Sequence, residues 1–259
     1  MVNEFQQQWT LILGGSSGLG LATAQKLAAH GMNLCIVHRN ARVELERIEQ
    51  DFDTMRARGV QVLSYNADAL SKEKQDEIIS ELVSKVGMGK IYGMVHSIAK
   101  GSLKSMTGED GLSKEDFQIT LQAMAVSLHE WTRAVFQAGL FAPQARILSF
   151  TSEGGRKPLP YYGAVSAAKA TLEAISRQIA LEYAPYGITS NCIQAGVTET
   201  PALKMIPNSD KIMEVARRRN PNKRLTTPED VANVTYLLLK KEASWINGTL
   251  IVADGGESL

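Results

Sequence analysis

The stretch that decides the fold of this 259-residue chain is Trp9-Thr-Leu-Ile-Leu-Gly14-Gly15-Ser16-Ser17-Gly18-Leu19-Gly20. Its first five residues are mostly apolar, which is typical of a strand buried on both faces. An amphipathic helical pattern begins at Leu21. Glycines between a strand and a helix let the backbone turn sharply and approach a pyrophosphate, whose charge then faces the N-terminus of the helix. The stretch therefore predicts a strand, a phosphate-binding turn and a helix.

Short β-rich runs alternate with helical patterns along the rest of the chain. The expected strands span residues 9–13, 33–37, 60–65, 91–97, 146–150, 188–193 and 249–252. The expected helices span residues 19–30, 43–58, 72–86, 113–138, 165–183 and 228–239. This alternation predicts one α/β domain over residues 1–259, a doubly wound parallel sheet (Rossmann fold) of about seven strands with helices on both faces. Residues 198–224 interrupt the alternation, and we expect them to form a short helical lid.

Composition limits the class of protein. The chain is 44% hydrophobic and 21% charged, which suits one large domain with a sizeable core. Its net charge of +1 gives no general attraction to nucleic acid or to an anionic membrane. Without a long apolar run, the chain is expected to be cytoplasmic, with no membrane insertion. Cys35 and Cys192 are expected to be buried thiols, and the four histidines lack the spacing of metal ligands.

The end of the second expected strand carries no acidic residue. It reads His38-Arg39-Asn40, and Arg42 follows closely. Enzymes that use NAD usually present an acid there to the ribose hydroxyls, whereas a 2′-phosphate would be repelled by an acid and held by Arg39 or Arg42. The strand end therefore favours NADPH over NADH. The alternative is that both arginines are solvated charges at the start of a helix.

The spacing of Tyr162 and Lys169 bears on the chemistry. Tyr162 stands seven positions before Lys169, and Val165 occupies the place four before it, where a tyrosine would share a helical face with the lysine. The wider spacing moves the phenol about 5 Å along the helix axis. When hydride reduces a ketone, the oxyanion forms beside the nicotinamide. When hydride reaches the β-carbon of an unsaturated thioester, charge collects on an oxygen two carbons further away, so its donor must retreat from the cofactor.

These motifs resemble those of the enoyl-acyl-carrier-protein reductases of the short-chain dehydrogenase/reductase family. The resemblance rests on the spacing of Gly14, Gly18 and Gly20 and on the tyrosine and lysine with six residues between them. It also rests on the run His96-Ser97-Ile98-Ala99, where ketone reductases of the family usually show Asn-Asn-Ala-Gly. It extends to the final strand and Asp254-Gly255-Gly256, so it covers essentially the whole chain.

The resemblance implies an NADPH-dependent reduction of the trans-2 double bond of enoyl-acyl-carrier-protein thioesters in fatty-acid biosynthesis. The implied partner is an acyl-carrier protein or a coenzyme A thioester, and the run Arg217-Arg218-Arg219 either receives that partner or is a solvated charge run. The resemblance also implies a homotetramer that associates through residues 113–138 and 165–183. The sequence leaves the chain-length preference and the sensitivity to inhibitors open.

The resemblance also implies a role for each site residue. Tyr162 would stabilise the enolate oxygen, Lys169 would hold the nicotinamide ribose, and Ser152 would either orient the thioester oxygen or cap its turn. Asp68 would meet the adenine ring or form a turn, and His96 is expected to be a structural hydrogen-bonding residue. The implied cofactor-binding set is Gly14, Ser16, Ser17, Gly18, Leu19, Gly20, Arg39, Arg42, Asp68, Ala69, Ser97, Ile98, Ala99, Lys169, Val197, Thr198 and Thr200.

Three other functions remain open from the sequence. The chain could be a carbonyl or 3-oxoacyl reductase that uses Ser152 and an unusually placed tyrosine, or an enoyl-coenzyme A reductase in another pathway. It could also be a regulatory protein that binds NADPH without turnover. Tyr161, which follows Pro160, is a second candidate donor outside the family spacing. The apolar residues of the expected lid would line an acyl chain or pack as an ordinary helix; they are Leu203, Met205, Ile206, Ile212 and Met213.

Overall fold

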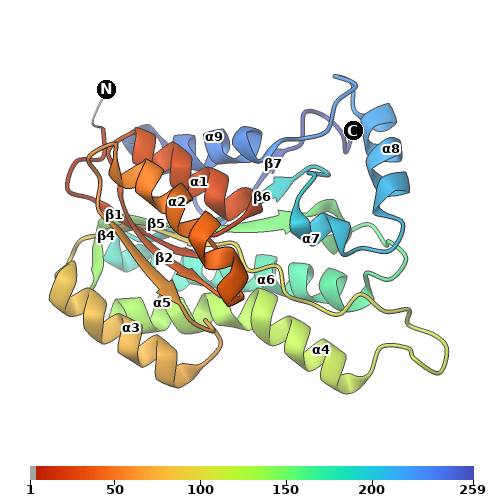
Figure 1. Cartoon of the computed structure of the whole chain (residues 1–259), viewed down its shortest axis with the longest axis horizontal. Helices are drawn as coiled ribbons and strands as arrows, with labels where there is room; N and C mark the ends of the chain where they lie inside the picture. The colour runs from red at the N-terminus through yellow and green to blue at the C-terminus, as the bar shows by residue number, and fades with distance from the viewer. Residues whose placement is uncertain (1–3) are drawn as a thin grey trace.

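A sheet of seven parallel strands runs through the centre of the molecule in the computed structural model, which describes residues 4–259 (Figure 1). The strand order is β3-β2-β1-β4-β5-β6-β7, so the direction of winding reverses between β1 and β4. A crevice at the carboxyl ends of the strands is expected at such a reversal. The doubly wound parallel sheet predicted from the sequence is confirmed. The strands are β1 Trp9–Leu13, β2 Asn33–His38, β3 Val62–Asn66, β4 Ile91–His96, β5 Phe141–Ser152, β6 Thr189–Ala195 and β7 Leu250–Ala253.

Helices cover both faces of the sheet (Figure 1). One face carries α1 Gly18–Ala29, α2 Leu45–Arg56 and α9 Pro228–Leu239, and α1 contacts α9 extensively. The other face carries α3 Lys72–Lys85, α4 Lys114–Leu121, α5 Ser127–Gln137 and α6 Gly163–Glu182. Two short helices, α7 Pro201–Lys204 and α8 Ser209–Arg219, follow β6 within the segment predicted as a lid. No helix within residues 4–259 is long and apolar enough to cross a membrane.

The alternation of side chains along each strand divides the core into two layers. Ile12 of β1 packs toward α1 and α9, whereas Leu11 and Leu13 pack toward α5 and α6. Burying one such leucine or isoleucine contributes about 1.5–3 kcal/mol. Cys35 and Cys192 are buried free thiols, as predicted.

Polar residues begin several of the helices that pack on this core. Ser113 and Asp116 form a capping box at α4, and Thr227 and Asp230 form another at α9. Each box satisfies backbone N–H groups that have no partner inside the helix. These caps fix where the helices start and therefore where the preceding loops end.

The single helix predicted over residues 113–138 is wrong. A π-helical turn at Gln122–Val126 divides it into α4 and α5. Residues Ala123 and Met124 of this turn pack against Val165 and Ala168 of α6. Apolar periodicity cannot reveal the extra residue of a π turn, and such turns are often found at functional sites.

Candidate functional site

The glycine turn between β1 and α1 lies against the end of β4. Gly14 has φ +88° and Gly18 has φ +53°, a backbone region that side chains rarely adopt. A Cβ on Gly20 would lie 2.1 Å from the carbonyl oxygen of Gly14, and a Cβ on Gly14 would lie 2.5 Å from the carbonyl oxygen of Ser97. The backbone N–H of Ser97 in turn donates to Leu13 across 2.8 Å. Glycine is therefore required here by close packing as well as by φ.

The N-terminus of α1 is a candidate phosphate site on these grounds. Ser17 is the N-cap residue, and its side chain makes no capping hydrogen bond within residues 4–259. The first N–H groups of the helix remain without side-chain partners and point toward the turn. Backbone donors at a helix N-terminus suit a pyrophosphate, so Gly18, Leu19 and Gly20 fit the predicted role.

A small polar network fixes the glycine turn to the end of β2. Ser16 donates its hydroxyl proton to Asn40 Oδ1 across 2.7 Å, and His38 Nδ1 lies 3.0 Å from the same oxygen. An amide oxygen only accepts hydrogen bonds, so Nδ1 of His38 carries the proton and Nε2 accepts from Ser64 across 3.0 Å. Burial lowers the pKa of His38 and keeps it neutral. The hydroxyl of Ser16 is therefore already used by Asn40, which holds the glycine turn to the end of β2.

Arg39 and Asp68 lie together, although the sequence assigned them to different parts of the cofactor. Their side chains form an ion pair of 2.8 Å at the ends of β2 and β3, with 62% and 37% of the side chains exposed. Such an exposed pair contributes at most about 1 kcal/mol, so a phosphate can displace the carboxylate from the arginine. Arg42 is exposed at the start of a 3-10 turn, Arg42–Glu44, close to the same strand end.

Tyr162 and Ser152 meet at the carboxyl end of β5. The phenol oxygen of Tyr162, the N-cap residue of α6, lies 3.3 Å from the hydroxyl oxygen of Ser152. Tyr161 precedes it in the left-handed region at φ +62°, which is a strained conformation for a bulky residue and helps to set the direction of Tyr162. Burial raises the pKa of Tyr162, and the hydrogen bond with Ser152 offsets part of that rise. The phenol is therefore protonated at neutral pH.

Lys169 is buried on the same helix, α6. Its ammonium donates to the backbone carbonyl of Phe150 across 2.6 Å. Burial lowers the pKa of Lys169 to about 8, while Cys192 and Glu173 act in the opposite direction. For the Tyr162 phenol, burial is the larger influence on the pKa and the hydrogen bond with Ser152 is the smaller one.

His96 is structural, as predicted. Its Nε2 donates a hydrogen bond to the hydroxyl oxygen of Ser127 across 2.8 Å. The hydroxyl of Ser127 in turn donates a hydrogen bond to the carbonyl of Ala123 in the π-helical turn. Burial lowers the pKa of His96 to about 3, so the ring stays neutral. Within residues 4–259, no group of three or more His, Cys, Asp or Glu side chains is placed to hold a metal ion.

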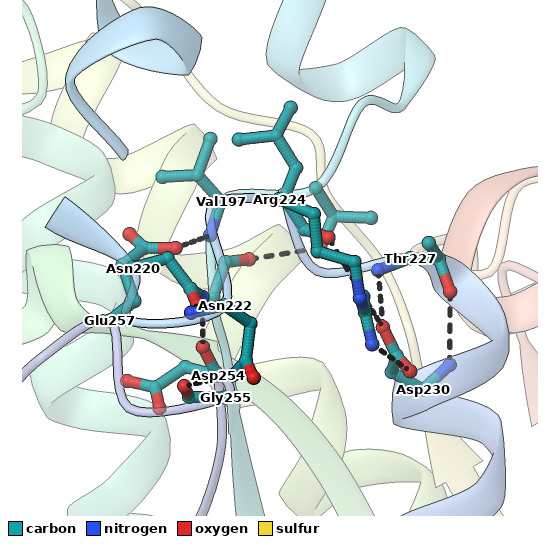
Figure 2. Close-up of polar contacts among 12 residues, drawn as sticks. Val197, Asn220, Asn222, Arg224, Thr227, Asp230, Asp254, Gly255 and Glu257 are labelled. Carbon is teal, nitrogen blue, oxygen red and sulfur yellow. Dashed lines mark hydrogen bonds and ion pairs between the residues drawn. The ribbon is translucent and has the colours of Figure 1, made fainter. Parts of the chain in front are cut away.

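The loop after β6 brings Thr200 to the glycine turn. A Cβ on Gly18 would lie 3.3 Å from the methyl group of Thr200, whose hydroxyl accepts from the N–H of Leu203 and caps α7. The N–H of Val197 donates to Glu257 across 3.0 Å, as Figure 2 shows. That N–H is therefore engaged within the chain, and the contact of the Val197 backbone with a cofactor stays a prediction. The neighbouring Thr198 remains the backbone donor that faces the site by the predicted alignment.

The other predicted cofactor residues fall into two groups. Ala69 and Ile98 are partly buried against the core beside α5, and the carbonyl of Ala69 accepts from the indole of Trp131. Ala99 is exposed, immediately after Ser97 and Ile98 at the end of β4. Side chains at the ends of β1, β2, β3, β4 and β6 therefore converge on one edge of the sheet.

Two buried carboxylates near the site were not predicted. Glu173 lies one turn after Lys169 on α6 and accepts from Thr151 across 2.9 Å and from Arg156 across 3.3 Å. Glu257 is also buried, near the end of the chain. The four-residue spacing between Lys169 and Glu173 could have indicated the first. The sequence offered no comparable signal for Glu257, because its partners lie 38 and 60 residues away.

The apolar residues of the predicted lid, which were expected to line an acyl chain or to pack as an ordinary helix, differ in their exposure. Leu203 is buried, Ile206, Ile212 and Met213 are partly buried, and Met205 is 74% exposed. Met106 is 69% exposed and packs beside Gly163, the residue after Tyr162. A Cβ on Gly163 would lie 3.0 Å from Cγ of Met106. Exposed apolar side chains therefore occur both near Tyr162 and on the lid.

Comparisons with known proteins give a consistent picture. A family model described as enoyl-(acyl carrier protein) reductase matches residues 14–258. The chain is 28% identical to the (2S)-[(R)-hydroxy(phenyl)methyl]succinyl-CoA dehydrogenase subunit BbsD of Thauera aromatica, over 98% of both proteins. It is 28% identical to levodione reductase of Leifsonia aquatica, over 98% of this chain and 96% of that protein.

A solved structure of similar shape is the enoyl-acyl carrier protein reductase of Bacillus cereus, in complex with NADP+ and indole naphthyridinone. It has a TM-score of 0.88 and 25% identity and covers 99% of this chain and 98% of that one. The sheet order, the glycine turn and a family match from residue 14 to residue 258 lead to one conclusion: the chain belongs to the short-chain dehydrogenase/reductase family of oxidoreductases.

Proposed function

We propose that this protein is an NADPH-dependent reductase of enoyl thioesters, with trans-2-enoyl-acyl-carrier protein as its substrate in fatty-acid biosynthesis. The observation that carries the proposal is the position of Tyr162. Its protonated phenol lies at the start of α6, 3.3 Å from Ser152, while Val165 is buried against Met124 at the place nearer the lysine. The donor therefore stands seven positions before the buried lysine instead of four, which suits reduction of a carbon–carbon double bond.

The proposed reaction assigns one role to each residue. NADPH supplies a hydride from nicotinamide C4 to the β-carbon of the substrate. The electron pair of the double bond then moves toward the thioester oxygen, and Tyr162 donates a hydrogen bond to the enolate that forms. A proton reaches the α-carbon from Tyr162 or from solvent, which completes the saturated thioester. Ser152 forms a hydrogen bond with the phenol and holds it close to the thioester oxygen.

Lys169 acts on the cofactor side of the site in this proposal. Its ammonium already donates to the carbonyl of Phe150 across 2.6 Å, and two further N–H groups remain for the nicotinamide ribose hydroxyls. A buried ammonium that is fixed at the end of β5 gives those hydroxyls a defined position. Glu173, four residues after Lys169 on α6, supplies a buried negative charge near the ammonium.

NADPH rather than NADH is proposed from the end of β2. Asn40 occupies the region where an acid would repel a 2′-phosphate, and its side-chain oxygen is already used by Ser16 and His38. Arg39 and Arg42 are the available cations. Arg39 would bind the 2′-phosphate in place of Asp68, with which it forms an exposed ion pair.

An acyl-carrier protein is the proposed partner because apolar and basic groups both occur around the site. Met106, Leu159 and Met205 are exposed apolar side chains that can contact an acyl chain. Arg217 and Arg218 are exposed near the C-terminus of α8, and positive charge there would attract an acidic carrier. A coenzyme A thioester would use the same cations through its phosphates.

A carbonyl reductase is the second candidate. The hydrogen bond between Ser152 and Tyr162 would also suit a ketone oxygen, and levodione reductase is among the relatives at 28% identity. In that case the phenol would protonate an alkoxide beside the nicotinamide. The two candidates differ in the substrate that is turned over and share the same acid.

The test compares the wild type and two variants on two kinds of substrate. NADPH oxidation is followed with a crotonyl thioester of acyl-carrier protein and of coenzyme A, and in parallel with an acetoacetyl thioester and a diketone; NADH replaces NADPH in a second series. Tyr162→Phe is expected to lower kcat on the enoyl substrates by at least about a hundredfold, because the enolate loses its donor. Tyr161→Phe is the matched control and is expected to retain wild-type kcat.

Several outcomes would contradict the proposal. Turnover confined to the ketones would establish the carbonyl reductase instead. Binding of NADPH without turnover of any substrate, and without an effect of Tyr162→Phe, would indicate a regulatory protein. Loss of activity in Tyr161→Phe with retention in Tyr162→Phe would mean that the donor was assigned to the wrong tyrosine.

A further inference from the structure

One peptide group beside the candidate site is held at both of its ends. The N–H of Val197 donates to Glu257 Oε2 across 3.0 Å, and the carbonyl of Gly196 accepts from the hydroxyl of Thr198 across 2.9 Å. We call this pair of hydrogen bonds the loop clamp. Figure 2 shows Glu257 reaching Val197 from the C-terminal segment.

Gly196 explains why this peptide group needs to be held. A Cβ on Gly196 would lie 2.3 Å from the hydroxyl of Thr226 and 2.9 Å from Glu257 Oε2, so only glycine fits beside the clamp. Glycine also gives the adjoining peptide groups more rotational freedom than any other residue. Without the clamp, the Gly196–Val197 peptide could rotate, and the backbone bridge between Thr198 and Thr226 would be left to orient the peptide that follows.

Arg219 joins the clamp to a second part of the site. Its guanidinium lies 3.2 Å from Glu257 Oε1, and it also pairs with Glu153, the residue immediately after Ser152. Arg219 is the last residue of α8. One arginine of the lid therefore contacts both the loop after β6 and the loop that carries Ser152.

Charge balance supports a specific role for Arg219. Glu257 is 2% exposed, and burial together with the charges of Asp254 and Glu153 raises its pKa, which Val197 and Arg219 oppose. Burial also raises the pKa of Glu153, but Lys157 and Arg219 lower it below its ordinary value overall. The two carboxylates would repel one another if the arginine between them were removed.

Besides the backbone bridge between Thr198 and Thr226, further contacts hold the C-terminal segment. Asn220 donates to the carbonyl of Asp254 across 2.8 Å, and Asn222 donates to that of Gly255 across 3.0 Å (Figure 2). Arg224 pairs with Asp230 at the start of α9. These contacts anchor the C-terminal segment to the chain after α8, but none of them reaches Val197 or Glu153.

We propose that Glu257 and Arg219 are positioning residues: Glu257 fixes the peptide that presents the Thr198 N–H to the nicotinamide half of the cofactor, and Arg219 ties this loop to the Ser152 loop and to the lid helix. The inference rests on the proposed use of NADPH. It predicts that loss of either residue weakens binding of the nicotinamide half of the cofactor and spares the adenosine half, which binds at the ends of β1 and β2.

Binding measurements can test this without any substrate. NADPH and 2′,5′-ADP, which lacks the nicotinamide half, are titrated against wild type, Arg219→Gln, Glu257→Gln and the double variant. Arg219→Gln is expected to raise the Kd for NADPH about tenfold, because it leaves two carboxylates without their shared cation, and to leave the Kd for 2′,5′-ADP unchanged. The double variant is expected to be no weaker than Arg219→Gln alone, because Glu257→Gln removes the uncompensated charge.

Lys211→Gln is the matched control, since Lys211 is exposed on the same helix and its side chain makes no ion pair within residues 4–259. Hydrogen exchange of a peptide that covers residues 194–203 is expected to rise in Glu257→Gln, where the partner of the Val197 N–H is weakened. Equal losses for NADPH and 2′,5′-ADP, or strictly additive effects of the two substitutions, would overturn the inference. A wild-type protein that binds neither compound would instead remove the proposed function, so the two failures are distinguishable.

Discussion

At the scale of single residues, the state of Lys169 is decided by its surroundings and not by its type. The side chain is 7% exposed, and its ammonium has one backbone acceptor. Burial lowers the pKa of Lys169 to about 8, against 10.5 in the unfolded chain. The charged form is therefore present below pH 8 and is lost as pH rises through that value, while the unfolded chain keeps its proton up to about pH 10.5.

This pKa predicts an alkaline limit to activity. The value of kcat/KM for NADPH is expected to fall about tenfold per pH unit above pH 8, because the neutral amine holds the ribose hydroxyls less tightly. In Lys169→Arg the guanidinium stays charged, so the residual activity is expected to lack this limb. The measurement is a pH profile from 6 to 10. A profile that stays flat to pH 9.5 in the wild type would contradict the role assigned to the ammonium.

At the scale of elements, the glycine turn depends on the approach of two backbone segments. Gly20 lies in the first turn of α1, and its α-carbon faces the carbonyl of Gly14 at a distance that admits no side chain. The turn is fixed on its other side by Ser97. The phosphate site is therefore a property of β1, α1 and β4 together.

Gly20→Ala is expected to open this turn. The added Cβ would lie 2.1 Å from the carbonyl oxygen of Gly14, so the turn must move and the N–H groups of α1 leave their positions. We expect the Kd for NADPH to rise at least about tenfold by fluorescence titration. Gly59→Ala is the control: it meets no atom within 4 Å but has φ +86°, so it is expected to lower stability by about 1 kcal/mol and to leave the Kd unchanged. An unchanged Kd in Gly20→Ala would contradict the assignment of this turn.

At the scale of the whole molecule, several exposed apolar side chains lie on the helices through which we propose that four copies associate. Ile119 of α4 is 52% exposed, and Leu181 of α6 is 70% exposed. Both fall inside the segments 113–138 and 165–183, and α4 contacts α6 directly. Burial of such side chains between copies would remove them from water.

The proposed homotetramer predicts a change in mass. Ile119→Asp combined with Leu181→Asp is expected to convert the wild-type tetramer to dimers or monomers in size-exclusion chromatography with light scattering, because a buried carboxylate is costly. Val83→Asp is the control, since Val83 is 40% exposed on α3, outside both segments. A wild-type monomer at micromolar concentration would contradict the proposal.

Local sequence patterns were sufficient to predict the seven strands and most of the helices. Continuous apolar runs gave the strands because a parallel sheet is buried on both faces, and the glycines at 14, 18 and 20 required a turn between the first strand and its helix. The spacing of Tyr162 and Lys169 was also local information, since both belong to one stretch of eight residues.

Only the tertiary structure decided which distant groups meet. The ion pair of Arg39 with Asp68, the hydrogen bond from Lys169 to Phe150, and the loop clamp formed by Glu257 join residues 29, 19 and 60 positions apart. The π-helical turn likewise depends on packing against α6. Local patterns encode backbone conformation and burial, but hydrogen bonds and pKa values depend on distances that arise only when the strands stand side by side.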